Sequence, residues 1–298
     1  MPTHLNPPSH APAPLPTDPQ TLADIQHVLE HGFVILPSLL SPSVVAACNA
    51  ELARLSGSTP SRGRNSFEGV ATVRIYALLN KSRIFDELVV LPRVLALNEY
   101  FLSPGYAISA MHSIEIGAGE RAQGLHHDDM FCDLSRPRRA LGTAVVVALD
   151  GFGVENGATR IVAGSHKWGG RVPRGGDEVV SVECEAGSVV YFLGTTWHGG
   201  GENRSGRPRR SVTVQYCQPW VRPIENQFLA VDPRKLDEIP ERIVDMMGYK
   251  VHKPFIGYVD GLSPRTAAKR MVQWLQKPAD CNPPSFAHRG DVEEKSKL

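Results

Sequence analysis

Short strand-like segments separated by glycine-rich turns dominate the chain between Pro104 and Tyr216. In the first of them, residues 106–116, apolar side chains alternate with small or polar ones, which is the two-residue period of a β-strand. Further segments of this kind lie at residues 142–149, 159–162, 179–182, 188–193 and 210–216. Because no helical pattern separates them, they favour an antiparallel sandwich or barrel over a parallel sheet with crossover helices.

Helical patterns precede the strands. Apolar residues recur at helical spacing over residues 21–31, and a buried strand is predicted at residues 33–40. A second helix is predicted to begin at Pro42, a residue type that suits the first helical position. A third helical stretch, residues 85–101, contains Pro92, which is expected to break or kink it.

The 298 residues fit one large domain, and the chain shows no internal repeat. Seven prolines fall within the first 19 residues, so residues 1–19 are predicted to form a disordered proline-rich arm. Residues 20–278 are predicted to be a single domain, followed by a polar C-terminal tail at residues 279–298.

Charge and cysteine content exclude several classes of protein. Thirty-two basic and 31 acidic residues leave a formal charge of +1, which argues against a protein that coats nucleic acid. No apolar run approaches the length of a membrane span. The five cysteines are scattered and never form a CxxC pair, which argues against a zinc ribbon and a disulfide scaffold.

A cluster of two histidines and two aspartates, residues 126–129, is the strongest chemical signal in the chain. Residues i and i+2 of an extended segment share a face, so the candidate ligand pairs are His126 with Asp128 and His127 with Asp129. With one more histidine, either pair completes the two-histidine, one-carboxylate set that suits non-haem Fe(II) and leaves coordination positions open.

The second histidine is expected from a later segment, and both His166 and His198 are candidates. His198 is favoured because a strand runs into the glycine turn 199–201, and glycines let the backbone approach a ligand closely. Four arginines follow within residues 204–210. A guanidinium that enters a barrel at the start of a strand can bind a carboxylate through two hydrogen bonds.

Together these segments resemble the phytanoyl-CoA dioxygenase family of Fe(II)- and 2-oxoglutarate-dependent oxygenases. The matching motifs, in chain order, are residues 123–129, 155–168, 198–203 and 209–211. The resemblance covers roughly residues 20–265, and four motifs in the correct order are far more specific than any one alone. It implies a mainly β fold with flanking helices, a distorted double-stranded β-helix (jelly roll, cupin-like).

The resemblance implies that His126, Asp128 and His198 are the iron ligands and the catalytic centre, which selects one of the two registers. The aspartate also bears on reaction type. Related halogenases carry a small residue at this position so that halide can bind the iron, so Asp128 favours oxygenation.

The same resemblance implies that Arg209 binds the distal carboxylate of 2-oxoglutarate. Arg210 is the competing choice, because only one of two adjacent strand residues can point inward. Gln123 and Thr159 are implied as further contacts of the co-substrate.

The implied reaction uses Fe(II), 2-oxoglutarate and O2 and releases succinate and carbon dioxide. It oxidises, most simply hydroxylates, an aliphatic C–H bond of a small hydrophobic substrate such as an acyl-CoA, a lipid-derived acid or a secondary metabolite. Arg136, Arg138 and Arg139 are candidates for binding CoA phosphates, although a solvated loop is the simpler interpretation. Other candidate pocket segments are residues 64–68, 74–76 and 130–133.

Two other functional classes use the same residues. A metal-dependent hydrolase is disfavoured because the HxHxDH pattern is absent. A catalytically silent jelly-roll protein that only binds a small molecule is the main alternative, and it gives no physical reason to retain three metal ligands and Arg209.

The chain ends in Ser296-Lys297-Leu298, the signal read by the peroxisomal import receptor in eukaryotes. The expected location is therefore peroxisomal in a eukaryote and cytoplasmic otherwise, and a peroxisomal location favours a lipid-derived substrate. The expected partners are a small-molecule substrate and this receptor, with no nucleic acid and no membrane span. A homodimer is left open.

Overall fold

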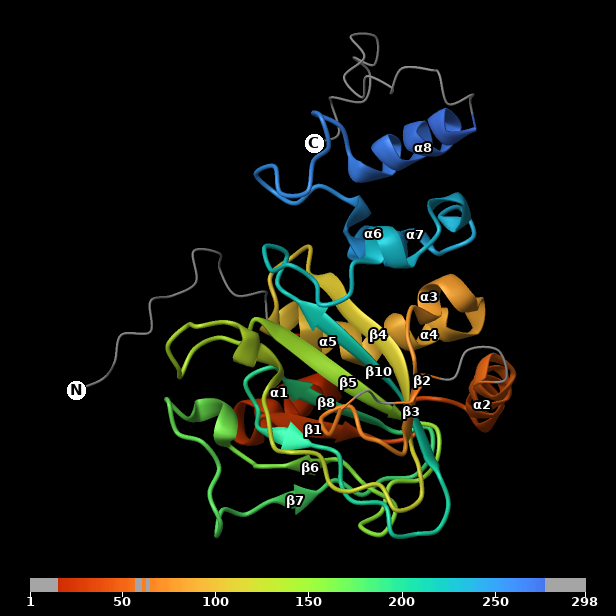
Figure 1. Ribbon diagram of the computed structural model, residues 1–298. Helices are drawn as coiled ribbons and strands as arrows, with labels where there is room; N and C mark the ends of the chain where they lie inside the picture. The colour runs from red at the N-terminus through yellow and green to blue at the C-terminus, as the bar shows by residue number, and fades with distance from the viewer. Residues whose placement is uncertain (1–15, 57–60, 63–64, 277–298) are drawn as a thin grey trace, which may run out of the picture.

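The computed structural model describes residues 16–56, 61–62 and 65–276. Its core is two antiparallel sheets that lie against each other (Figure 1). The larger sheet contains, in spatial order, β1 (Phe33–Leu36), β8 (Val189–Leu193), β5 (Gly142–Ala148), β10 (Arg209–Cys217), β4 (Ala107–Ile116), β3 (Thr72–Ile75) and β2 (Ser61–Arg62). The smaller sheet contains β7 (Val180–Ser181), β6 (Arg160–Ile161) and β9 (His198–Gly199). This arrangement confirms the predicted mainly β, antiparallel fold with flanking helices.

Most of the helices in the first third of the chain lie in stretches that the sequence predicted to be helical. They are α1 (Pro19–His31), α2 (Pro42–Ser56), α3 (Leu78–Lys81), α4 (Asp86–Val89) and α5 (Pro92–Phe101). The predicted stretch at residues 85–101 is divided at Pro92, which starts α5, because proline lacks the N–H that an interior helical position would need. The predicted strand at residues 33–40 ends earlier, at Leu36.

The remaining helical segments are shorter or lie toward the C-terminus. They are η1 (Arg83–Phe85), η2 (Asp128–Phe131), η3 (Ser165–Lys167), α6 (Gln227–Ala230), η4 (Pro233–Lys235), α7 (Glu241–Val244), the π-helical turn η5 (Asp245–Tyr249) and α8 (Pro264–Leu275). None of the helices in the described ranges is long and apolar enough to cross a membrane.

Both faces of the larger sheet are covered at β5, and this strand is buried along its whole length. Val145 and Val147 face the helices and belong to the larger apolar core, and α5 lies behind the sheet in Figure 1. Ala144 and Val146 face the smaller sheet and belong to a second core between the two sheets. The two-residue period of a strand therefore separates a helix-facing side from an inner side.

The neighbouring strand β10 also has a helix-facing side and an inner side, but its inner side is polar. Val212 and Val214 pack into the helix-facing core. Ser211, Thr213 and Gln215 lie on the inner side, where they line a cavity rather than filling the space between the sheets. Small and polar residues on this one face thus keep the interior of the sandwich open beside β10.

Only residues 16–19 of the predicted arm are described, and the predicted tail lies outside the described residues. Helix α1 already begins at Pro19, with the Asp18 carboxylate accepting a hydrogen bond from the Thr21 N–H, so regular structure starts at the last residue assigned to the arm. The domain boundaries otherwise stay predictions. The described cysteines Cys48, Cys132, Cys184 and Cys217 form no disulfide.

We expect Asp86→Asn to stabilise the protein at pH 7.5. Burial raises the pKa of Asp86 to about 6, although Arg83 lies 3.3 Å from the carboxylate and opposes the rise. The folded state therefore holds this proton more tightly than the unfolded chain, and stability falls as the pH rises from about 4 to about 6. The cost at neutral pH is at most about 3 kcal/mol.

Thermal unfolding of both proteins at pH 4.5 and pH 7.5 checks this. The gain in Tm from Asp86→Asn should be larger at the higher pH, because asparagine cannot ionise. A variant that is less stable than the wild type at pH 7.5 would contradict the expectation.

Candidate metal centre

A cavity of about 350 Å³ opens between the inner face of the larger sheet and the smaller sheet. Side chains of β3, β4 and β10 contribute to its lining, together with β9 and with Phe192 of β8. Residues 66–69, several residues between Glu120 and Met130, and Thr159 and Ile224 also line it. This volume falls in the range of small-molecule sites, so the cavity is the place to look for a functional centre.

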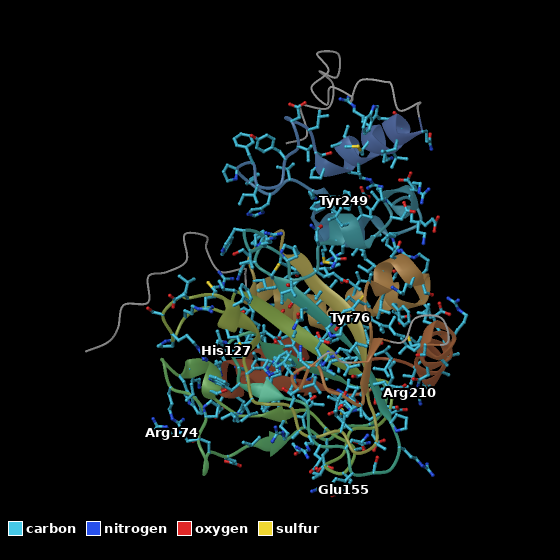
Figure 2. All side chains as sticks on the ribbon, viewed as in Figure 1. Tyr76, His127, Glu155, Arg174, Arg210 and Tyr249 are labelled. Atoms are coloured by element: carbon cyan, nitrogen blue, oxygen red, sulfur yellow. The ribbon has the colours of Figure 1, made fainter. Side chains whose placement is uncertain are left out.

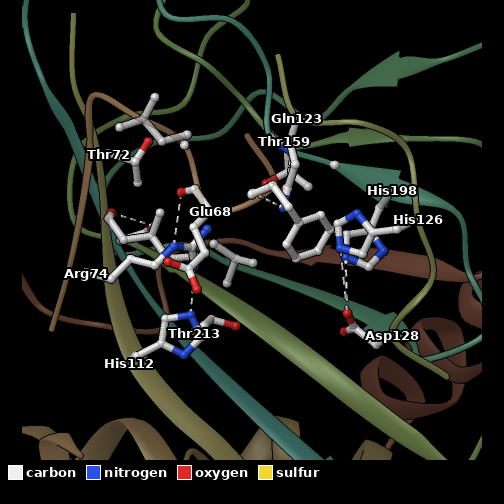
Figure 3. A pocket seen from close by; sticks show the side chains of 18 of the residues that line it. Glu68, Thr72, Arg74, His112, Gln123, His126, Asp128, Thr159, His198 and Thr213 are labelled. Carbon is white, nitrogen blue, oxygen red and sulfur yellow. Dashed lines mark hydrogen bonds and ion pairs between the residues drawn. The ribbon is translucent and has the colours of Figure 1, made fainter. Parts of the chain in front are cut away.

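Three potential metal ligands meet at one side of the cavity (Figure 3). They are His126, Asp128 and His198, and one ligand atom from each lies within 4.8 Å of the other two. The Asp128 Oδ1 atom is 3.8 Å from His126 Nε2 and 3.6 Å from His198 Nε2. The structure therefore brings together the ligand set that the family resemblance implied.

Backbone pairing places the two histidines side by side. His126 and His198 form an antiparallel bridge in which each backbone N–H donates to the other's carbonyl, at 2.9 and 2.7 Å. Their rings lie 4.4 Å apart, centre to centre. The glycine turn permits this approach, because a Cβ atom on Gly199 would lie 3.2 Å from the carbonyl oxygens of Gln123 and Gly124.

The hydrogen bonds of both histidines suit a metal. His126 Nδ1 donates to the Gly124 carbonyl at 3.1 Å, and His198 Nδ1 donates to the Thr196 carbonyl at 2.9 Å, which leaves Nε2 of each ring as the nitrogen that can bind a metal. Burial and the neighbouring His198 lower the pKa of His126 to about 4, so this ring is neutral at physiological pH.

The carboxylate completes a donor set that fits ferrous iron. Asp128 Oδ2 is buried and has no hydrogen-bond partner, which costs free energy unless a cation is present. Two imidazole nitrogens and one carboxylate are the ligands of mononuclear non-haem Fe(II) sites. These three residues therefore form the candidate metal site of the described part of the chain.

The alternative ligand pair, His127 and Asp129, makes packing and hydrogen-bond contacts within the protein instead. The His127 ring packs edge to face on Trp197, 5.0 Å between centres. The Asp129 carboxylate accepts hydrogen bonds from the Leu141 N–H at 2.7 Å and from Arg138 at 2.9 Å. His166 was the competing candidate for the second histidine. Its Nε2 atom lies 3.1 Å from the carbonyl oxygen of Leu29 in helix α1.

The chain at Asp128 also differs from the extended geometry assumed in the sequence argument. His127 is extended, but Asp128 begins the 3-10 turn η2. The carboxylate thus reaches the histidines because the chain turns at this residue, not because a straight strand continues.

Of the two adjacent arginines, Arg209 lines the cavity. It is 2% exposed, donates to Ser211 Oγ at 3.0 Å and to the Gly157 carbonyl, and lies over the Phe152 ring. Burial lowers its pKa only to about 10, so it is a buried cation at neutral pH. Within the described residues it has no carboxylate partner at ion-pair distance, which leaves it suited to an anionic ligand.

Arg210 serves a different purpose. Its side chain, labelled in Figure 2, forms two hydrogen bonds with the Asp150 carboxylate, both at 3.0 Å, and does not line the cavity. Because successive strand residues point to opposite sides, only Arg209 faces the cavity.

Gln123 and Thr159 line the same cavity. The Gln123 amide donates to the Phe67 carbonyl at 3.0 Å and accepts from the Gly200 N–H at 3.1 Å, so its side chain is held against the glycine turn. Thr159 is buried. All six sequence-predicted site residues therefore share one cavity, while the contacts of Gln123 and Thr159 with a co-substrate stay predictions.

The sequence argument did not single out one polar cavity residue, His112 of β4. Its Nε2 lies 2.9 Å from Arg74 Nη1, and burial together with Arg74 lowers the pKa of His112 to about 3. A signal was present, because the alternation of residues 106–116 puts this histidine among the apolar, inward-facing positions. A polar residue at such a position marks either a buried hydrogen bond or a binding site.

An antiparallel two-sheet sandwich with two histidines and a carboxylate at one side of a cavity is the arrangement found in non-haem iron oxygenases. Residues 28–211 match the family model described as phytanoyl-CoA dioxygenase. Dioxygenase swnH1 of Metarhizium robertsii is 31% identical over 281 residues, which cover 85% of this chain and 89% of the relative. Dioxygenase olcK of Penicillium canescens is 28% identical, with 76% and 77% covered. The chain belongs to the phytanoyl-CoA dioxygenase family and is an enzyme of the dioxygenase class.

Solved structures with the same fold confirm the predicted jelly roll. The epimerase SnoN from nogalamycin biosynthesis, in complex with Fe3+, alpha ketoglutarate and nogalamycin RO, has a TM-score of 0.58 at 23% identity, covering 71% of this chain and 90% of its own. HygX from Streptomyces hygroscopicus, with nickel and 2-oxoglutarate bound, has a TM-score of 0.57 at 16% identity, covering 67% and 88%.

Proposed function

We propose that this protein is an Fe(II)- and 2-oxoglutarate-dependent dioxygenase that hydroxylates an aliphatic C–H bond of a small, largely hydrophobic molecule. The observation that carries the proposal is the presence of His126, Asp128, His198 and the buried Arg209 in one cavity. The metal and 2-oxoglutarate bound to the similarly folded SnoN and HygX support it.

In this proposal the bound iron, 2-oxoglutarate and O2 supply the oxidising chemistry, with release of succinate and carbon dioxide. The chain supplies position and environment. The two histidines and Asp128 hold the metal, and Arg209 binds the far carboxylate of the co-substrate. Phe192, whose ring lies 4.3 Å from that of His198, is 2% exposed and excludes water from this side of the centre.

The lining of the cavity favours a largely apolar substrate. Phe67, Met130 and Ile224 line it, yet each is more than half exposed, at 51%, 59% and 60%. Large apolar side chains that gather around one opening mark a binding surface. His112 and Gln215 also line the cavity and offer hydrogen-bonding groups, which favours a substrate that also carries a polar group.

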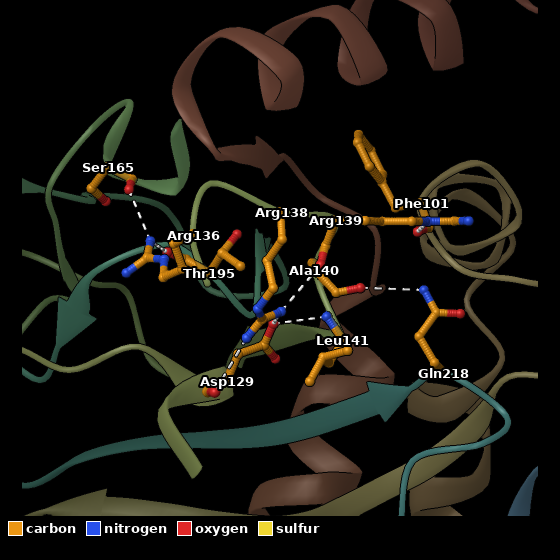
Figure 4. Close-up of polar contacts among 10 residues, drawn as sticks. All are labelled: Phe101, Asp129, Arg136, Arg138, Arg139, Ala140, Leu141, Ser165, Thr195 and Gln218. Carbon is orange, nitrogen blue, oxygen red and sulfur yellow. Dashed lines mark hydrogen bonds and ion pairs between the residues drawn. The ribbon is translucent and has the colours of Figure 1, made fainter. Parts of the chain in front are cut away.

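The three arginines considered for CoA phosphates have hydrogen-bond partners within the chain (Figure 4). Arg136 donates to the carbonyls of Ser165 and Thr195, Arg138 pairs with Asp129, and Arg139 donates to the Phe101 carbonyl. Residues 131–139 are nevertheless all exposed or half-buried, in agreement with the solvated-loop interpretation, and phosphate binding by these arginines stays a prediction. We therefore favour a free acid or a secondary metabolite over an acyl-CoA.

The test is an anaerobic titration of the metal-free protein, first with Fe(II) and then with 2-oxoglutarate. We expect the weak visible charge-transfer band of the iron chelate to appear only after both are present. Admission of O2 with a candidate substrate should then release succinate in step with substrate loss, faster with small acids or metabolites than with their CoA thioesters. Iron binding with no band would favour the silent small-molecule-binding alternative.

We also propose import into peroxisomes in a eukaryotic cell, based on the terminal Ser296-Lys297-Leu298. These residues lie outside the described ones. A fluorescent fusion that stays in the cytosol with the tripeptide intact and free would contradict this location.

A further inference from the structure

Three consecutive backbone carbonyls in the turn before His198, residues 194–196, each accept a hydrogen bond. The Gly194 carbonyl accepts from the Asp129 N–H at 2.9 Å, and the Thr195 carbonyl accepts from Arg136. The Thr196 carbonyl accepts from His198 Nδ1 at 2.9 Å. Since Asp129 is the neighbour of the ligand Asp128, this one turn is tied to two of the three ligands.

The Asp129 side chain is fixed from the other side by an ion pair. It is 2% exposed, and its Oδ2 atom accepts from Leu141 N–H and from Arg138 Nη1. Arg138 Nη2 also lies 3.4 Å from the Asp129 carbonyl (Figure 4). One guanidinium therefore holds both the side chain and the backbone of the residue that follows the ligand.

Arg136 does the same for the His198 segment. Its Nη2 donates to the Ser165 carbonyl at 3.0 Å as well as to Thr195. The hydroxyl of Ser165 accepts from the N–H of Trp197, the residue before His198, at 2.9 Å. Arg136 and Ser165 thus hold the His198 segment at two successive points.

The two segments are packed too closely to shift against each other. A Cβ atom on Gly194 would lie 2.3 Å from Asp129 Oδ1 and 2.9 Å from the Gly142 carbonyl. Only glycine fits where the Asp129 carboxylate meets the turn. Neither Asp129 nor Arg138 lines the main cavity, so their effect on the centre is indirect.

We propose that Asp129, Arg138 and Arg136 are positioning residues that fix the separation of Asp128 from His198 and thereby set the metal affinity. The proposal rests on the metal site of the proposed function. A buried ion pair adds little net stability over apolar residues of similar size, so geometric specificity is the better explanation for it here. Partners of metal ligands typically change metal affinity or activity 10- to 100-fold when they are removed.

The experiment compares Asp129→Asn, Arg138→Met and Arg138→Lys with the wild type. Arg139→Met is the matched control, because Arg139 also donates to a backbone carbonyl from the same loop but contacts neither ligand segment. Each metal-free protein is titrated with Co(II), and affinity, visible spectrum and Tm are recorded. We expect Asp129→Asn and Arg138→Met to weaken Co(II) binding about 10- to 100-fold and to alter the spectrum.

Arg138→Lys should recover part of the affinity, and Arg139→Met should stay within about twofold of the wild type. If the wild type itself fails to bind Co(II), the proposed function fails. If the wild type binds, while Asp129→Asn and Arg138→Met lose Tm but keep affinity and spectrum, the positioning role is overturned. Should either variant not fold, unchanged affinity in the milder Arg138→Lys overturns it equally.

Discussion

His126→Ala and Asp128→Ala are expected to abolish 2-oxoglutarate decarboxylation. Each removes one of the three atoms that converge within 4.8 Å, and no other described side chain is placed to substitute. Removing a residue that only hydrogen-bonds a metal ligand already lowers metal affinity or activity about 10- to 100-fold. Removing a ligand itself should therefore lower turnover by more than about 100-fold. Succinate release at saturating Fe(II) and 2-oxoglutarate measures this.

The matched control is His166→Ala. This histidine was the competing candidate from the sequence, yet it contacts helix α1 instead of the centre. Its loss should lower Tm and leave turnover within a few-fold of the wild type. If His126→Ala and Asp128→Ala both turn over normally, the iron assignment is wrong.

Arg209→Ala should weaken 2-oxoglutarate binding by at least about 30-fold. Removing one partner of a buried, hydrogen-bonded charge pair costs about 2–5 kcal/mol, and this guanidinium is the buried cation of the cavity wall. Arg209→Lys should recover only part of the loss, because an ammonium cannot form the paired contacts of a guanidinium. The charge-transfer band, titrated at limiting co-substrate, reports the affinity.

Arg210→Ala is the adjacent control. Arg210 pairs with Asp150 and is partly exposed, and such pairs contribute only about 0–1 kcal/mol. We therefore expect about twofold or smaller changes in 2-oxoglutarate affinity. The reverse result, a large loss in Arg210→Ala and none in Arg209→Ala, would show that the other face of β10 binds the co-substrate.

Most of the fold follows from local patterns in the chain. The alternation over residues 106–116 predicts β4, and Pro92 predicts the start of α5, because strand period and proline geometry are properties of a few neighbouring residues. The two-residue strands β6 and β7 are shorter than the patterns suggest, since their pairing partners, not their own residues, set where each ends. The strands β2, β3 and β9 and the helices α3 and α6 to α8 were not predicted.

The candidate site divides in the same way. The residue pattern alone predicted a metal site at residues 126–129 in one of two registers, and that only one of Arg209 and Arg210 faces inward. It left both choices open, and the family resemblance implied Asp128 and Arg209. Tertiary structure decided between these options, because strand periodicity fixes relative faces but not which face meets the core. His126 pairs with His198, which lies 72 positions later, and this pairing selects the register with Asp128. The face of β10 that lines the cavity selects Arg209. Both contacts join segments far apart in the chain, so no single segment encodes them.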